Sequence, residues 1–412
     1  MNNYLRLGAL ALGTFALGMA EFSMMGILSE ASNAMDISIS RGGDFISFYS
    51  LGVAVGAPML LFLRNYRLAR VLSWLCVMIL IGNALSAAAQ SYGMLVAARF
   101  ISGLPHGAYF GTAAIVAARI VPPGKGAEAV AIMVAGMSVA TGAGVPLSTL
   151  MSELVSWRLT FVISAAVAAL GAGCIRLCVP RVQLAPVKNI SGQCAFLRHA
   201  APWMIFAATF LGQGSIYCWY SYVEPCMRQI AGFTPGQMTW VMMVAGMGFV
   251  VGGLASGRLS DRFSPSKVTC LVAAFSIVLL PSIYLFAADK AVSVVLMFLA
   301  TACLFGIGGP LQYLIIKFAK GGEMLGGAGI QVAFNTSNAC SAAIGGAVIH
   351  AGYSLAAPAL VGIPLAVAAT VVLWVFHHKY RDLVRACSVS SKKQRCASPL
   401  SDPRTAVIIR CV

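Results

Sequence analysis

The sequence predicts an all-α polytopic membrane protein in which twelve transmembrane helices form two six-helix bundles. Three observations lead to this prediction: a mean hydropathy of +0.86, a content of only 10% charged residues, and apolar stretches that recur along the whole chain. A helix needs about 20 mostly apolar residues to cross a bilayer. In a chain of 412 residues, twelve such stretches leave no room for a separate soluble domain.

The apolar stretches fall into two sets of six. Short polar or basic turns separate them, and glycine and proline recur inside them, as is usual for membrane helices. We expect one bundle within residues 1–179 and another within 202–376, joined by a polar, basic cytoplasmic linker at 180–201. The expected spans are 5–28, 43–63, 71–89, 94–118, 128–151, 159–179, 202–223, 237–257, 268–287, 292–316, 326–349 and 355–376.

The last segment, residues 377–412, differs from the rest of the chain in composition. It carries eight basic and two acidic residues and shows no apolar periodicity. Segments of high net charge and low hydrophobicity bury too little apolar surface to fold. We therefore expect a basic cytoplasmic tail that is disordered.

Lysine and arginine are distributed unevenly between the two sides of the predicted membrane. With the N-terminus in the cytoplasm, 23 of the 28 basic residues lie on that side, four lie on the other, and Arg99 lies within the membrane. Cytoplasmic loops are the ones enriched in basic residues, so both termini are predicted to be cytoplasmic. The net charge of +16 then belongs to loops that face anionic lipid, and no nucleic-acid partner is expected.

Two charged residues lie deep within apolar stretches, Glu21 in the first and Arg99 in the fourth. A charge near the bilayer centre costs at least about 2.5–3.5 kcal/mol, so such residues are usually retained for a function. At 1.5 Å per residue, Glu21 lies about 22 Å above the inner surface and Arg99 about 8 Å below the outer one. In a core about 30 Å thick, the two residues share one depth and can pair. The pair either couples proton movement to transport or fixes helix packing.

His106 lies about two turns beyond Arg99 on the same stretch. Imidazole titrates near neutral pH, so this residue is a third candidate for proton coupling, although hydrogen-bonded packing is the alternative. Glu153 and Glu224 fall at outer helix ends, where we expect ordinary solvated carboxylates.

Polar and aromatic side chains on the seventh, tenth and eleventh stretches are candidates for substrate binding. Amides hydrogen-bond and aromatic rings stack, which suits an uncharged polyhydroxylated or amphipathic ligand. The same groups can instead join helices to one another. The candidates are Gln213, Tyr217, Trp219, Tyr220, Gln312, Gln331, Asn335 and Asn338.

Several other protein classes are disfavoured by the residue pattern. Histidine and aspartate are scarce, and no spacing is typical of a catalytic triad, a phosphate-binding loop or a metal site. We therefore expect no enzymatic activity, no metal and no cofactor. No element resembles the ring-like filter of a channel, whereas a membrane sensor that does not transport is a further alternative.

Three motifs resemble those of the major facilitator superfamily. The fourth stretch has its Arg-x-x-x-Gly-x-x-x-Gly signature, and the turn after the eighth has its Gly-x-x-x-Asp-Arg order. The fifth stretch has a separated Gly and Pro where the superfamily's antiporter motif has an adjacent pair. These residues are Arg99, Gly103, Gly107, Gly257, Asp261, Arg262, Gly144 and Pro146.

Longer segments resemble one particular group within this superfamily. GMAEFSMMGILSE in the first stretch and KGGEMLGGAGIQVAFN in the eleventh are similar to the AraJ-like sugar-efflux group, within the drug:proton antiporter branch. The resemblance implies a secondary active transporter of the bacterial inner membrane that exports sugars or related small polar solutes by alternating access. An exporter of multidrug or cationic compounds is the alternative.

The resemblance also implies roles for individual residues, a driving force, partners and an oligomeric state. It links Arg99 to proton coupling and the glycine, proline and turn motifs to gating. It implies a proton gradient as the driving force, the lipid bilayer and a small-molecule substrate as partners, and a monomer as the working form.

Overall fold

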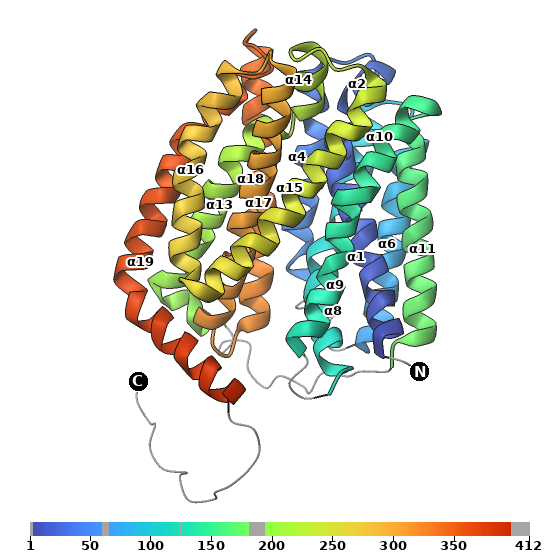
Figure 1. Ribbon diagram of the computed structural model, residues 1–412. Coiled ribbons are helices and arrows are strands. Elements are labelled where there is room, and N and C mark those ends of the chain that lie inside the picture. Colours follow the sequence, from blue (N-terminus) through green and yellow to red (C-terminus); the bar gives the residue numbers. More distant parts are fainter. Residues whose placement is uncertain (1–2, 60–65, 123–125, 181–193, 397–412) are drawn as a thin grey trace, which may run out of the picture.

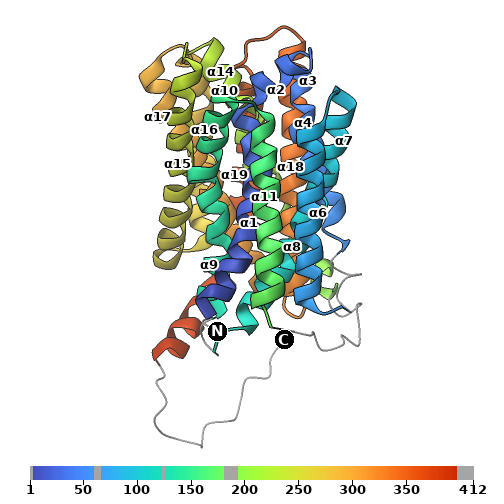
Figure 2. The same ribbon diagram turned by 90° about the vertical axis from the view of Figure 1, so that its right-hand side faces the viewer.

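The computed structural model describes residues 3–59, 66–122, 126–180 and 194–396. Within these ranges the chain is helical and contains no β-strand, which confirms the predicted all-α class. The helices form two bundles that lie side by side with their long axes roughly parallel (Figures 1 and 2). The described residues up to 180 form the N-terminal bundle, and those from 194 to 396 form the C-terminal bundle.

The N-terminal bundle contains long helices, short connecting helices and one π-helical turn. Its elements are α1 (Asn3–Gly26), α2 (Leu28–Ala34), α3 (Ile39–Gly42), α4 (Asp44–Gly56), α6 (Leu68–Ala88), α7 (Tyr92–Gly103), α8 (Pro105–Arg119), α9 (Gly126–Val139), η1 (Ala140–Gly144), α10 (Val145–Leu154) and α11 (Arg158–Cys178).

The C-terminal bundle follows a short 3₁₀ turn. Its elements are η2 (Ala195–Arg198), α13 (Ala200–Tyr220), α14 (Val223–Gln229), α15 (Pro235–Arg262), α16 (Pro265–Leu285), α17 (Lys290–Phe318), α18 (Glu323–His350) and α19 (Pro358–Cys396).

In the part of the chain that the structure describes, nine helices are long and apolar enough to span a membrane. The predicted spans 43–63, 94–118 and 202–223 are not among these nine. The first extends into residues outside the described ranges, the second is divided between α7 and α8, and the third corresponds to α13. The total of twelve therefore stays a prediction.

Proline lies at two places where a predicted span is divided between helices, one in the fourth span and one in the fifth. Pro105 opens α8 directly after α7, because proline has no N–H to donate and breaks the helical hydrogen-bond ladder. Pro146 follows the π-helical turn η1, and π-turns are frequent at functional sites. Gly144 closes that turn, so the residues that resemble the antiporter motif lie at an irregularity in the predicted fifth span.

Helix α19 extends past residue 377, where the expected tail begins, and ends at Cys396. The disorder of the tail stays a prediction. Residues 397–412 and most of the expected linker lie outside the described residues.

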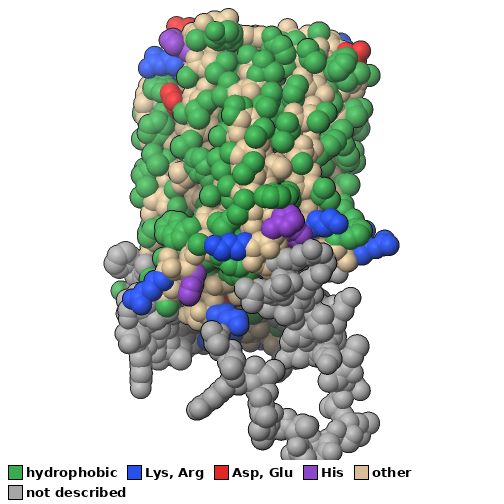
Figure 3. All heavy atoms as spheres, turned by 90° about the vertical axis from the view of Figure 1, so that its left-hand side faces the viewer, with side chains coloured by type: hydrophobic (Ala, Val, Ile, Leu, Met, Phe, Trp, Pro, Cys, Tyr) green, Lys and Arg blue, Asp and Glu red, His purple; other side chains and the backbone are tan. Residues whose placement is uncertain are grey.

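The surface of the bundles is suited to lipid. The face formed by α16 and α19 is largely hydrophobic, with lysine and arginine gathered near one end (Figure 3). Its exposed side chains include Leu271, Phe275, Val278, Leu285 and Trp374. An exposed apolar surface of this extent is stable in a bilayer and not in water.

Two pairs of helices join the bundles to each other: α4 packs against α18, and α10 packs against α15. We call the end that carries α2, α3 and α14 the distal end, and the end near the N-terminus the terminal end (Figure 1). Four hydrogen bonds between described residues of the two bundles lie in the distal half. The donors and acceptors are Ser29 N–H to Glu224, Arg228 to Glu30, Ser40 to the Gly346 carbonyl and Ser47 to the Ala339 carbonyl.

Glycine allows α4 to pack closely on α7 and α8. A Cβ atom on Gly52 would overlap the Phe100 carbonyl, and one on Gly103 would overlap the Tyr49 carbonyl. A Cβ on Gly107 would lie 2.8 Å from the Cβ of Ala57. The glycines of the Arg-x-x-x-Gly-x-x-x-Gly signature therefore form the surface on which α4 rests.

We predict that Gly52→Ala lowers the stability of the folded protein by about 1–3 kcal/mol, because the added methyl forces α4 away from α7. Thermal unfolding in detergent measures the effect. The matched control is Gly309→Ala, since no atom lies within 4 Å of a Cβ built at that position. Equal midpoints for the two variants would contradict the packing argument.

Candidate functional site

The Glu21 carboxylate lies at the centre of the molecule, where the two bundles meet. The residue is 1% exposed, and neither carboxylate oxygen accepts a hydrogen bond. The imidazole of His106 on α8 faces it, with Nε2 3.8 Å from Glu21 Oε2, beyond hydrogen-bond distance. A buried carboxylate without hydrogen bonds is costly, so this group needs a proton or a ligand to satisfy it.

Arg99 binds the backbone of two neighbouring helices. Its Nη1 donates to the carbonyl of Ala20 on α1 at 2.7 Å, and its Nε donates to the carbonyl of Phe45 on α4 at 3.1 Å. Its guanidinium carbon lies 4.3 Å from the centroid of the Tyr49 ring. The side chain is fully buried, and its Nη2 has no hydrogen-bond partner.

The structure brings Glu21 and Arg99 near each other, as expected, but their side chains do not form a direct ion pair. The two charges are close enough to interact electrostatically, as their common depth predicted. However, the Arg99 donors bond to backbone carbonyls, and the side chain that faces the Glu21 carboxylate is the His106 imidazole. The reason is local: Ala20 precedes Glu21 on α1, and its carbonyl is within reach of the guanidinium.

His106 is held by Tyr49, a residue that the sequence analysis did not select. The Tyr49 hydroxyl and His106 Nδ1 form a hydrogen bond of 2.9 Å, and the imidazole stacks on Phe110. Because Nδ1 is engaged, Nε2 is the nitrogen that faces Glu21. The only available signal for Tyr49 was a phenolic hydroxyl within an otherwise apolar stretch.

The C-terminal bundle contributes polar groups to the same place. Asn338 on α18 and Tyr217 on α13 lie close to the Glu21 carboxylate. The Tyr217 hydroxyl and both polar atoms of the Asn338 amide are buried and have no hydrogen-bond partner. Two of the predicted substrate-binding residues therefore meet the predicted coupling residue at the contact between the bundles.

The other substrate-binding candidates are more scattered. Tyr220 is buried against Tyr217 and Phe249, and Asn335 donates to the Gln331 carbonyl one turn earlier on α18. Gln213 is 5% exposed, and a Cβ on Gly308 of α17 would lie 2.9 Å from its Nε2. Gln312 and Gln331 are half-buried.

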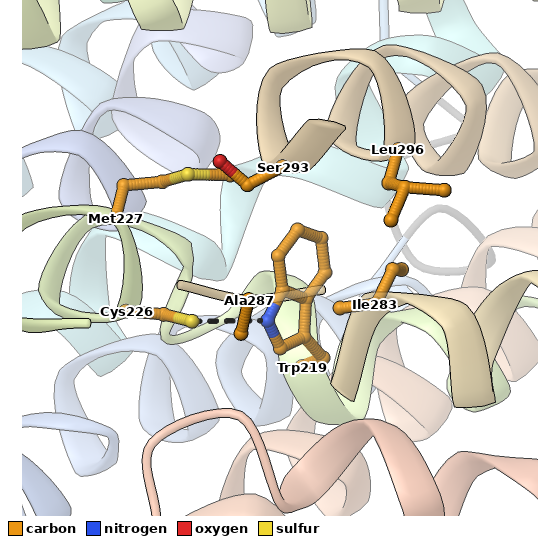
Figure 4. A pocket seen from close by; sticks show the side chains of 7 residues that line it. All are labelled: Trp219, Cys226, Met227, Ile283, Ala287, Ser293 and Leu296. Atoms are coloured by element: carbon orange, nitrogen blue, oxygen red, sulfur yellow. Dashed lines mark hydrogen bonds between the residues drawn. The ribbon is translucent and has the colours of Figure 1, made fainter. Parts of the chain in front are cut away.

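Trp219 lines a small apolar cleft between α13, α14, α16 and α17 (Figure 4). Its indole N–H donates to Cys226 Sγ at 3.4 Å. The cleft is lined by Trp219, Cys226, Met227, Ile283, Ala287, Ser293 and Leu296. Tyr217 and Tyr220, which contact each other, are not among the residues that line this cleft.

The predicted turn motif lies at the terminal end of α15. Gly257 has open space around it, and Arg262 is exposed, with its guanidinium carbon 5.5 Å from the Phe263 ring centroid. Asp261 lies within the same helix, and its side chain is outside the described part of the structure.

Glu224 corrects one expectation. We expected a solvated carboxylate at an outer helix end, but the side chain is 1% exposed and accepts hydrogen bonds from Ser29 N–H and Arg228. The residue is buried because α2 of the N-terminal bundle packs on α14. Only the tertiary arrangement brings α2 to that position.

Within the described residues, no three His, Cys, Asp or Glu side chains are grouped so as to hold a metal ion. The polar centre consists instead of one carboxylate, one imidazole, one guanidinium, tyrosine hydroxyls and amides.

Comparison with known proteins places this two-bundle helical membrane protein in a family. Residues 10–328 match the Major Facilitator Superfamily. The chain is 43% identical over 345 residues to "Putative transporter AraJ" of Escherichia coli (strain K12), covering 84% of this chain and 88% of that protein. It is 32% identical over 377 residues to "Inner membrane transport protein YdhP" of the same strain, covering 91% and 97%.

Solved structures agree in fold. A D-xylose-proton symporter superposes with a TM-score of 0.73 at 13% identity, covering 90% of this chain and 97% of that one. A mutant form of the nucleoside transporter NupG gives 0.72 at 11% identity, covering 91% and 100%. This chain belongs to the major facilitator superfamily and is a multi-span membrane transporter.

We predict that Arg99→Met destabilises the protein by about 3–5 kcal/mol, because it removes two charge-assisted hydrogen bonds and leaves Glu21 without a nearby cation. Thermal unfolding in detergent measures the loss. Arg41→Met is the control, since Arg41 is exposed at the distal end over the Tyr92 ring. An unchanged midpoint in Arg99→Met would show that the guanidinium does not hold α1 and α4 together.

Proposed function

We propose that this transporter is a proton-coupled antiporter of the bacterial inner membrane that exports sugars or related small polar solutes by alternating access. The observation that supports the proposal is the Glu21 carboxylate, which is buried at the contact between the bundles with neither oxygen hydrogen-bonded. Such a carboxylate alternates naturally between two satisfied states, one with a bound proton and one with donors from a solute.

The charge balance of the centre favours an uncharged solute. Arg99 places one positive charge beside Glu21, and both groups are buried. An ionised Glu21 therefore gives a neutral pair, and a protonated one leaves a net positive charge. Bound to the ionised pair, an uncharged solute leaves the centre neutral, whereas a cationic solute gives it one net positive charge, which is costly in this apolar surrounding.

The polar atoms without partners suit a polyhydroxylated solute. Glu21 offers acceptors, and Tyr217 and Asn338 offer both donors and acceptors. Sugar hydroxyls both donate and accept, so one ring can satisfy all three groups at once. Because Glu21 belongs to one bundle and the other two to its partner, a bound solute would contact both halves.

Alternating access requires the distal contacts to open. In the structure the bundles are hydrogen-bonded to each other in their distal half, through Ser40 to Gly346 and Ser47 to Ala339 among others. We propose that the terminal end, which carries most basic residues, faces the cytoplasm. The structure then represents a state closed toward the periplasm, and we expect one chain to form the working unit.

We predict that Glu21→Gln abolishes solute transport driven by a pH gradient, because glutamine cannot release a proton, while exchange down the solute's own gradient continues. The measurement is flux of a panel of pentoses and hexoses in proteoliposomes with an imposed pH gradient. Glu153→Gln, at an exposed carboxylate, serves as the control. Gradient-driven flux that persists in Glu21→Gln would remove Glu21 as the proton carrier.

The same assay decides between the two solute classes. We expect gradient-dependent flux of at least one sugar and none of cationic dyes. Flux of cationic compounds alone would replace the proposed solute with the multidrug alternative, and no gradient-dependent flux of either class would overturn the antiporter proposal.

We further predict that Asn338→Ala raises the KM for the transported sugar about tenfold, since the lost hydrogen bonds are worth about 1–1.5 kcal/mol. Initial rates over a range of sugar concentrations give KM and the maximal rate separately. Asn33→Ala, at an exposed position of α2, is the control. An unchanged KM in Asn338→Ala would place the solute elsewhere.

A further inference from the structure

A small ionic cluster joins the two bundles at the distal end. Arg228 Nη1 on α14 forms an ion pair with Glu30 Oε1 on α2 and lies 3.0 Å from Glu224 Oε1 on its own helix. The Ser29 N–H donates to Glu224 Oε2 at 2.9 Å. We call Ser29, Glu30, Glu224 and Arg228 the distal latch, because two of these three contacts cross between the bundles.

The charges of the distal latch do not balance. It contains two carboxylates and one guanidinium, so it carries one net negative charge when both acids are ionised. Glu224 is 1% exposed, whereas Glu30 is 27% and Arg228 is 25% exposed. Water can therefore solvate Glu30 but not Glu224, and the uncompensated charge is costly at Glu224.

The neighbouring elements bring no second cation to Glu224 among the described residues. The last turn of α1 and the first turn of α15, which both pack against α14, carry no charged residue. Lys290 of α17 lies over the Phe233 ring, Asp44 of α4 accepts a hydrogen bond from Tyr92, and Glu153 of α10 faces the first turn of α15.

An acceptor for a proton on Glu224 is already in place. The Ser29 hydroxyl is buried beside the Glu224 carboxyl, where it can donate to the ionised form, which lowers the pKa, or accept from the neutral form. A neutral Glu224 can donate its proton to the hydroxyl oxygen and still accept the Ser29 N–H through its other oxygen. Arg228 and Glu30 then remain as a balanced pair across the bundles.

We propose that the distal latch takes up one proton, at the Glu224 carboxyl, when the bundles close at the distal end, and releases it when they open. On opening, α2 moves away from α14, the carboxyl reaches water, and it ionises. The inference rests on the alternating movement in the proposed function, but it does not require Glu21 to carry a proton or any solute to bind.

The expected pH dependence follows from the shift at Glu224. Burial, and then the negative charge of Glu30, raise the pKa of this carboxyl from 4.5 to about 7 in the closed state. A solvated carboxyl in the open state keeps its ordinary pKa. The closed state therefore binds the proton more tightly, so a falling pH favours closure and a rising pH favours opening. A proton supplied from the periplasm would thus promote the closing step.

The test measures the distance between the bundles in the full chain, in lipid nanodiscs and without solute. Spin labels are attached through an unnatural amino acid at Asn33 and Tyr353, which are exposed at the distal end of opposite bundles. All samples carry Glu21→Gln, so that the central carboxylate does not titrate. Between pH 8 and 5 we expect the ratio of closed to open molecules to rise, by at most about tenfold per pH unit.

Two variants assign the response to the distal latch. Glu224→Gln should stay closed at every pH, because the amide imitates the neutral carboxyl and its oxygen can accept the Ser29 N–H. Glu153→Gln should keep the original profile. The proposal is overturned if the closed fraction ignores pH, if it rises with pH, or if Glu224→Gln retains the response. Because transport is not measured, none of these outcomes depends on whether Glu21 is the proton carrier.

Discussion

The guanidinium of Arg99 is the interaction on which the centre of the N-terminal bundle depends. A cation in an apolar interior must find all its hydrogen-bond acceptors within the protein, since the bilayer offers no water. Here it finds two, the Ala20 carbonyl of α1 and the Phe45 carbonyl of α4, with the Tyr49 ring against its face and Nη2 left without a partner. The contact fixes α1 beside α4 and so places Glu21 opposite His106.

The need to satisfy buried charges within the protein acts at two places between the bundles, with different results. At the centre, one carboxylate lies near one guanidinium, yet neither carboxylate oxygen is hydrogen-bonded. In the distal latch, hydrogen bonds are made, yet two carboxylates share one guanidinium. Each place is therefore incomplete in a way that a proton can correct, the first by satisfying bare acceptors and the second by removing surplus charge.

The fold explains why both places lie between the bundles. Helix α4 lies in the second expected span and packs on α18 in the eleventh, while α10 lies in the fifth and packs on α15 in the eighth. Exchanging the two sets of six spans converts one contact into the other, as expected for a transporter built from parallel repeats. In the alternating movement proposed above, polar groups that meet along these contacts become exposed when the bundles separate. Their hydrogen bonding and their charge state are consequently tied to the relative position of the halves.

The sequence by itself determined the helical class, the membrane setting and the family, because hydropathy and local glycine and proline motifs are properties of short segments. It also brought Glu21 and Arg99 to one depth, because helical rise converts residue number into height. Helical rise gives the depth of a residue, but it does not give the direction in which its side chain points or the distant segments that pack against it. The tertiary structure alone decided that Arg99 bonds to carbonyls, that Tyr49 holds His106, and that α2 buries Glu224.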